Sequence, residues 1–218
     1  MAITFDLLET KRAHVAKYSD RMPDRKVIED CLYKSWKTTP SKNNAMPYQV
    51  HVWTKQEHKE EIHKLSVRNH NENRQHTNPK DNPYFLHIKT APYLISVHGR
   101  VATPNKYYKT LIDNEGLYFD WADEKAMNRI KATTSLEVGM FFANLSLYLL
   151  EEGLDVSYNG CFKKDVKLWQ EAGLDVKYKP LAMMSIGHAE SYRKDQINML
   201  EEKFDIKPEL KEIIKWIN

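Results

Sequence analysis

An apolar stretch from Val138 to Leu150 constrains the fold more than any other segment of this sequence. It lies within a segment that is predicted to form one long helix from about residue 126 to residue 152. Gly153 follows directly and suits the left-handed backbone of a helix C-cap. Because its apolar side chains fall on nearly all sides, this helix should be buried on most sides. Either one large core or a partner surface must cover it.

The remaining patterns predict shorter helices and strands around this long helix. Capping residues and apolar periodicity predict helices at about residues 4–12, 24–37, 55–68, 162–172 and 207–217. Alternating or apolar runs predict strands at 48–53, 93–98, 154–158 and 178–186. Helices come first, then strands separated by helices, and then a C-terminal arm over residues 190–218. This order predicts a single α+β layered domain over residues 1–218, not a regular βαβ winding.

Two long segments fit neither pattern. Residues 69–83 are almost wholly polar and end in Pro79 and Pro83, so we expect a surface loop there. Residues 99–125 form an insertion that carries five aromatic side chains: Tyr107, Tyr108, Tyr118, Phe119 and Trp121. These aromatic side chains could stack on a bound molecule or pack in an interface. The insertion is therefore a candidate lid.

Charge and cysteine content exclude several classes of protein. The 33 basic and 30 acidic residues are intermixed, so the net charge of +3 predicts no strong field for nucleic acid. No apolar run approaches the length of a membrane span, and the first residues lack a signal-peptide layout. Cys31 and Cys161 are the only cysteines and do not form a Cys-x-x-Cys pair. We therefore expect a cytoplasmic protein in a reducing compartment.

The familiar catalytic motifs are missing. The sequence has no Gly-x-x-x-x-Gly-Lys loop, no Gly-x-Gly-x-x-Gly turn and no Gly-x-Ser-x-Gly elbow. Its nine histidines include no grouping with zinc-ligand spacing, so we expect no metal.

Two basic pairs lie far apart in the sequence. Lys11 and Arg12 end the first predicted helix, and Arg193 and Lys194 follow the last predicted strand. Guanidinium groups offer forked donors that suit a phosphate, and two distant pairs could converge on one such group. Taken alone, the first pair is more typical of a solvated helix C-terminus, where basic side chains are favoured.

Two polar segments lie at the ends of strands. Pro40, Ser41 and Asn44 lie in the loop before the strand at 48–53, where their side chains could bind a polar ring edge. Asn159 and Gly160 follow another strand; the glycine would let the backbone approach a flat ligand, and Asn159 could offer an amide. Taken alone, both segments are ordinary turns.

Taken together, five segments resemble the nitroreductase family of flavin enzymes. Lys11 to Tyr18 is similar to the family's Arg-Arg-Ser-Val-Arg-x-Phe opening, and Pro40 to Tyr48 resembles its Pro-Ser-x-x-Asn-x-x-Pro-Trp loop. Thr90 to Ile95 resembles the Asp-Ala-Pro strand start. The other two segments resemble the family's long central helix and its closing Gly-Tyr segment: residues 135–154, and Ile186 with Gly187.

The resemblance implies a nitroreductase-like fold, with a central mixed or antiparallel sheet flanked by helices, and an FMN-binding homodimer with FMN at the interface. The positions that it assigns to FMN are Arg12 and His14 at the phosphate and ribityl chain, Pro40, Ser41 and Asn44 over the ring, Asn159 and Gly160 at the reactive ring nitrogen, and Arg193 with Lys194 at the phosphate.

The sequence departs from the family pattern at several of these positions. His14 replaces the usual serine and Ala16 a usual basic residue, while Tyr84 and His87 occupy the places of an expected Asn-x-x-Lys. FMN could therefore bind more weakly, or the phosphate could instead be met by Lys11, His14 and Arg193.

The resemblance also implies a reaction. NAD(P)H would deliver hydride to FMN, and an acceptor such as a nitroaromatic or quinone would then be reduced in a ping-pong cycle. No catalytic side chain is expected, because the chemistry belongs to FMN. Three alternatives stay open: a flavin-binding protein without turnover, a flavin-free structural homodimer, and a specialised branch of the family that performs reductive dehalogenation or flavin breakdown.

Overall fold

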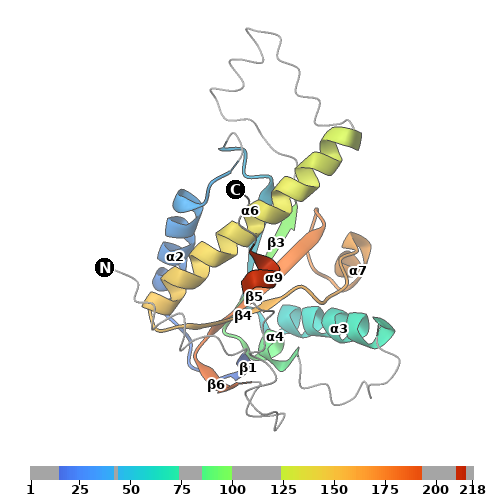
Figure 1. Cartoon of the computed structure of the whole chain (residues 1–218). Helices are drawn as coiled ribbons and strands as arrows, with labels where there is room; N and C mark the ends of the chain where they lie inside the picture. The colour runs from blue at the N-terminus through green and yellow to red at the C-terminus, as the bar shows by residue number, and fades with distance from the viewer. Residues whose placement is uncertain (1–14, 42–43, 74–84, 100–123, 193–209, 215–218) are drawn as a thin grey trace.

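The structure is a computed structural model that describes residues 15–41, 44–73, 85–99, 124–192 and 210–214 (Figure 1). Its centre is a four-stranded sheet in the order β2-β3-β5-β4, in which every neighbouring pair is antiparallel. The strands are β2 (Tyr48–Trp53), β3 (Tyr93–Gly99), β4 (Asp155–Asn159) and β5 (Pro180–Gly187). The α+β layered fold with an antiparallel central sheet is confirmed.

Helices cover both faces of this sheet (Figure 1). One face packs against α2 (Arg25–Thr38) and α6 (Glu124–Glu151), with Ile95, Val97 and Leu145 fully buried between the layers. The other face packs against α3 (Gln56–Asn73), α4 (Leu86–Thr90) and α7 (Val166–Glu171), around Trp169 and Met183. A further short helix, α9, spans Leu210–Ile213. Burying apolar side chains on both faces is what holds the three layers together.

The long helix largely matches its prediction. Leu145 and Leu149 are fully buried, and Gly153 adopts a φ of 73° directly after the helix. Leu136, in contrast, keeps 65% of its surface exposed. Contacts with α2 and with the sheet within one chain thus account for most of the apolar residues between Val138 and Leu150.

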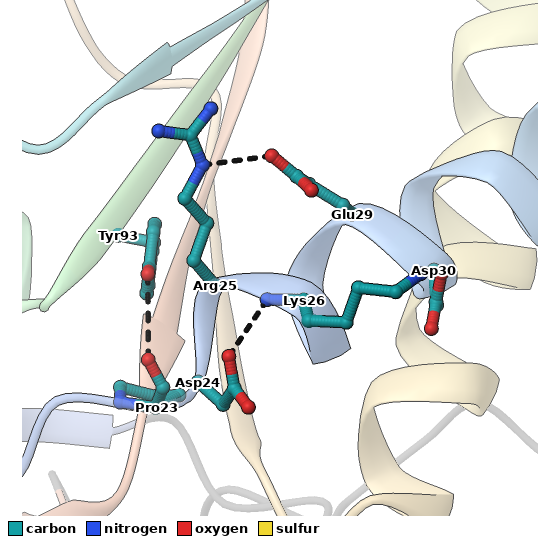
Figure 2. Close-up of polar contacts among 7 residues, drawn as sticks. All are labelled: Pro23, Asp24, Arg25, Lys26, Glu29, Asp30 and Tyr93. Carbon is teal, nitrogen blue, oxygen red and sulfur yellow. Dashed lines mark hydrogen bonds and ion pairs between the residues drawn. The ribbon is translucent and has the colours of Figure 1, made fainter.

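The start of α2 shows how local sequence sets a helix boundary (Figure 2). The Asp24 carboxylate accepts a hydrogen bond of 2.9 Å from the Lys26 N–H, which is one of the unpaired donors of the first turn. Arg25 and Glu29 form an exposed ion pair along the helix at 2.7 Å. The Tyr93 hydroxyl donates to the Pro23 carbonyl at 3.3 Å and so ties this corner to β3.

A second, two-stranded sheet joins the first described segment of the chain to the segment that follows β5. Strand β1 (Val15–Tyr18) pairs with β6 (Ala189–Tyr192) in antiparallel fashion, so that Val15 lies opposite Tyr192. The sequence patterns missed both strands because each has only four residues and the pairing contains register shifts. We call this pair the β1–β6 ribbon.

Other predictions need correction. Helix α3 continues to Asn73, so residues 69–73 are helical and do not belong to a loop. Helix α7 begins only at Val166, because Asp165 caps it by accepting from the Lys167 N–H. The start of the expected arm, up to Tyr192, belongs to β6. The helix predicted at 4–12, residues 74–83 of the polar loop and residues 100–123 of the insertion lie outside the described residues.

Within the described ranges, no helix is long and apolar enough to cross a bilayer.

A buried histidine of β3, His98, packs against His51 of β2 and Trp169 of α7. The Nδ1 atom of His98 lies 2.9 Å from the Tyr178 carbonyl, which can only accept, so Nδ1 carries the proton. In the neutral imidazole, the Nε2 atom accepts from the Ser96 hydroxyl at 2.7 Å, and Ser96 in turn accepts from the Trp53 indole N–H at 2.7 Å. This chain of hydrogen bonds is complete with His98 as a neutral imidazole. Burial lowers the pKa of His98 to about 4.

We expect His98 to make the protein less stable in mild acid. In the unfolded chain the pKa of histidine is about 6.5, so the unfolded state takes up a proton as the pH falls from about 6.5, whereas the folded state does so only near 4. The free energy of unfolding should therefore fall by on the order of 3 kcal/mol across this window. Urea unfolding at pH 7 and pH 4.5 measures the fall, and His98→Gln should make the curve flatter. An equally steep fall in His98→Gln would contradict this assignment.

Candidate functional site

The loop between α2 and β2 carries three of the predicted site residues. Pro40 and Asn44 are exposed, and Ser41 is half-buried. The Ser41 hydroxyl accepts from the Met46 N–H at 2.9 Å, and the Ser41 carbonyl accepts from the Asn44 N–H at 3.0 Å. Asn44 adopts a φ of 51°, which asparagine tolerates better than most residues. The loop is thus braced from within, and the Asn44 side chain lies at the surface.

Helix α6 anchors the root of this loop. The Asn144 amide donates to the Thr39 hydroxyl at 3.3 Å, directly before Pro40. The Thr39 hydroxyl in turn donates to the Ser35 carbonyl at 2.7 Å, which closes the last turn of α2. The position of the loop therefore depends on the packing of α2 against α6.

Asn159 and Gly160 lie at the end of β4. Asn159 keeps only 7% of its surface exposed, and its Oδ1 atom accepts from the Cys161 N–H at 2.6 Å. Its Nδ2 atom is buried and has no hydrogen-bond partner among the described residues. Gly160 is exposed, and a Cβ atom added there would meet nothing within 4 Å. The end of β4 thus combines an unused amide donor with open space beside the backbone.

The same turn of α6 also holds the end of β4. The Tyr158 hydroxyl forms a short hydrogen bond with the Ser146 hydroxyl and lies 3.3 Å from the Phe142 carbonyl. Residues 142–146 of α6 therefore support both the loop after α2 and the end of β4. Two site segments that are far apart in the sequence share one rigid support.

The remaining predicted residues flank the β1–β6 ribbon. Lys11, Arg12, His14, Arg193 and Lys194 all lie outside the described residues. The described strands next to them in sequence pair with each other. Val15 directly follows His14, Tyr192 directly precedes Arg193, and Val15 and Tyr192 are partners in the ribbon. Val15 and Tyr192, which adjoin the two basic segments in sequence, therefore lie at the same end of one small sheet.

A buried carboxylate ties the ribbon to β4. Asp155 keeps 7% of its surface exposed and accepts from the Ala189 N–H at 2.9 Å and from the Tyr192 hydroxyl at 3.0 Å. On the other strand, the Tyr18 hydroxyl donates to the Ser185 carbonyl at 2.9 Å. Burial, together with the charge of Asp155, raises the pKa of Tyr18 well above its ordinary value, so the phenol stays protonated.

Gly187 allows the close approach of the ribbon to the sheet. A Cβ atom at this position would lie 2.6 Å from Cδ of Pro92 and 2.9 Å from Cδ1 of Tyr18. Sequence reasoning missed Asp155, Tyr192 and the packing role of Gly187. A carboxylate at the start of a strand gives no signal of its distant partners.

Within the described ranges, no group of three His, Cys, Asp or Glu side chains is arranged to hold a metal ion. The site is therefore built from amide, hydroxyl and backbone groups at the end of β4 and in the loop after α2.

Comparisons with known proteins agree with this architecture. The sequence model described as the nitroreductase family matches residues 10–188. No curated protein sequence matches the chain significantly.

Solved structures with similar folds include three bacterial proteins. A nitroreductase family protein from Streptococcus pneumoniae TIGR4 has a TM-score of 0.65 at 17% identity, over 98% of this chain and 100% of its own. A protein from Exiguobacterium sibiricum 255-15, named as a nitroreductase in complex with FMN, has a TM-score of 0.67 at 17% identity, over 100% and 99%. One from Staphylococcus epidermidis ATCC 12228, named as a NAD(P)H:FMN oxidoreductase, has a TM-score of 0.67 at 15% identity, over 100% and 98%. At these identities the similarity shows the fold.

Proposed function

The chain belongs to the nitroreductase family, and on that premise we propose that it is an FMN-dependent oxidoreductase. It would use NAD(P)H to reduce acceptors of the nitroaromatic or quinone type in a ping-pong cycle. The observation that carries the proposal is the end of β4, where the buried Asn159 amide lacks a partner next to the open backbone at Gly160.

The residues present fit FMN. A buried amide donor without an acceptor is unfavourable, and a carbonyl or ring nitrogen of a bound flavin would supply that acceptor. Apart from its chain neighbours, no described residue comes within 4 Å of a Cβ placed at Gly160, which leaves room for a flat ring against the backbone. We propose that Pro40, Ser41 and Asn44 cover the ring system, and that Lys11, Arg12, His14, Arg193 and Lys194 hold the phosphate.

A bound FMN would supply the redox chemistry, which is hydride acceptance followed by electron donation. The protein supplies orientation and electrostatics. The Asn159 amide and the backbone at Gly160 are proposed to donate to the ring edge where negative charge develops during reduction. The Cys161 N–H fixes the orientation of the amide by donating to its Oδ1 atom, so that Nδ2 is the group left for the ring.

The proposed phosphate site depends on the β1–β6 ribbon. An FMN phosphate carries a charge of roughly −1.5 to −2 and therefore needs several cationic groups. The pairing of Val15 with Tyr192 supports a common site, because the two basic segments adjoin these partners in sequence. We further propose that FMN lies at the interface of a homodimer. We also propose that the insertion expected at residues 99–125 forms the substrate-side lid, except for its first residue, which belongs to β3, and its last two, which belong to α6.

The visible absorption spectrum of the purified protein tests this function, together with mass spectrometry of the ligand released on denaturation. A flavin spectrum with FMN released, bleached anaerobically by NADH or NADPH and restored by a quinone, is the expected result. A bound flavin that is inert to both nucleotides would leave a binding protein without turnover. A colourless protein that also fails to take up FMN would refute the proposal.

We expect Asn159→Asp to slow the reduction of the bound flavin by NAD(P)H by about 100-fold. The new carboxylate keeps an oxygen that can accept from the Cys161 N–H, but it replaces a donor with a negative charge where the ring gains electrons. Stopped-flow absorbance under anaerobic conditions measures the rate. Because the turn should stay intact, the FMN content is the internal control. A wild-type rate at normal FMN content would show that Asn159 does not face the ring.

A further inference from the structure

A pocket of about 560 Å³ lies between the β1–β6 ribbon and the corner where α3 meets α4. Small-molecule sites span roughly 300–1,000 Å³, so the pocket is large enough for a ligand. Pro40, Ser41, Asn44, Asn159 and Gly160 do not line it, so it is separate from the described part of the proposed flavin site. Its described lining includes five charged side chains: Lys17, Asp20, Lys59, Lys89 and Glu190.

Lys59 is a buried ammonium that has no counter-ion in the described part of the chain. Only 5% of its surface is exposed, and its Nζ atom donates to the Ala91 carbonyl at 2.7 Å. Among the described residues no carboxylate forms an ion pair with it. A lysine ammonium has three N–H donors, and among the described residues only one of the three donors of Lys59 has a partner. Burying a charge that is not paired is costly, and burial accordingly lowers the pKa of Lys59.

The other charged groups around the pocket do not neutralise Lys59. Lys17 and Glu190 form an ion pair with each other at 2.6 Å, across the β1–β6 ribbon. Lys89 lies on the α4 side of the pocket and Asp20 is exposed. Besides the Lys17–Glu190 pair, the described lining therefore holds two lysines, Lys59 and Lys89, and one carboxylate, Asp20, so this part of the pocket has an excess of positive charge.

Helix α3 adds to this excess. Thr54 and Gln56, at the start of this 18-residue helix, line the pocket. The first backbone N–H groups of a helix lack acceptors within the helix, and the helix dipole places partial positive charge at this end. The Gln56 amide donates to the Lys89 carbonyl at 3.1 Å, which holds α3 and α4 at a fixed separation. This hydrogen bond between α3 and α4 thus helps to hold the wall of the pocket in place.

We propose that this pocket is a second ligand site, which binds a small oxyanion of phosphate or carboxylate type against the Lys59 ammonium. The oxyanion would accept from the two Nζ donors that have no partner among the described residues and supply a counter-charge, with Lys89 and the start of α3 as further positive groups. The inference does not depend on the flavin function.

Titration calorimetry of the flavin-loaded protein with inorganic phosphate and, separately, with acetate tests the proposal. Sodium chloride at matched ionic strength controls for screening. We expect saturable binding of one of the two anions, and Lys59→Met should weaken it by about 10- to 100-fold, the usual range for a charged hydrogen bond. Lys64→Met is the matched control, because Lys64 lies on the same helix with 67% of its side chain exposed and pairs with Glu61. The absorbance of bound flavin should not change during the titration.

A second measurement keeps the proposal testable if Lys59→Met does not fold. Lysine side chains labelled with ¹³C at Cε report their own pKa values by NMR in the wild-type protein. The bound anion should raise the lowest lysine pKa, and Lys89→Met should weaken anion binding several-fold. Equal anion binding by wild type and Lys59→Met would overturn the proposal. So would the absence of saturable binding of both anions at millimolar concentrations, or displacement of the flavin by the anion.

Discussion

Arg12→Ala should lose its FMN while the protein stays folded. A charged hydrogen bond to phosphate contributes about 1.5–3 kcal/mol, so removing the guanidinium should weaken FMN binding by about 10- to 100-fold. Arg12 lies three residues before Val15, and Val15 pairs with Tyr192. This pairing brings together the two residues that adjoin the basic segments in sequence. The flavin-to-protein absorbance ratio after gel filtration, and the dissociation constant from fluorescence titration with FMN, measure the loss.

Arg25→Ala is the matched control for Arg12→Ala. Arg25 is an exposed arginine in the first turn of α2 that pairs with Glu29 (Figure 2). Its removal should leave the flavin content unchanged. If Arg12→Ala stays yellow and active, the assignment of Arg12 to the phosphate is wrong.

Gly187→Ala should destabilise the fold and reduce FMN binding together. The new methyl group would overlap the Pro92 ring and the Tyr18 ring, at 2.6 and 2.9 Å. Neither ring can give way easily, because Tyr18 is buried and its hydroxyl is held by the Ser185 carbonyl. Overpacking of this kind costs about 1–3 kcal/mol, which urea unfolding would measure.

Because the strain lies between the sheet and the β1–β6 ribbon, displacement of the ribbon should also disturb the proposed phosphate site. The matched control is Gly139→Ala. Gly139 is an exposed position of α6 where a Cβ atom would meet nothing within 4 Å. Because alanine favours a helix more than glycine does, this variant should be as stable as wild type or up to about 1 kcal/mol more stable. A Gly187→Ala protein with wild-type stability and flavin content would contradict the close packing described for β1.

The long helices and strands were predictable because each is long enough to show a repeating pattern of apolar and polar residues. Residues 48–53 alternate and form β2 with the predicted bounds, and the apolar run up to Leu150 forms the buried half of α6. The polar side of α3 was harder to interpret. Residues 69–73 extend the helix although their polarity suggested a loop, because a surface helix can continue with few apolar residues.

The short elements were not predictable, because tertiary contacts define them. Strands β1 and β6 form only because they pair with each other. Asp155, in β4, holds β6 by accepting from the Ala189 N–H. For the site, sequence and resemblance together indicated Asn159 and Gly160, and the structure adds the reason that the Asn159 amide is free: the Cys161 N–H occupies only its oxygen. Lys59 gave no sequence signal, since its importance lies entirely in its burial without a counter-ion among the described residues.

The β1–β6 ribbon also has a consequence for synthesis on the ribosome. The Lys17–Glu190 ion pair joins residues 173 positions apart, so β1 is made long before β6 and must wait for it to find its partner. Contacts of such long range form late, because closing the intervening chain costs entropy before any pairing stabilises it. The nascent chain should therefore assemble its layered core first and pair β1 only after residue 192 has left the exit tunnel. The proposed phosphate site beside the β1–β6 ribbon would then be completed only after β6 has been made.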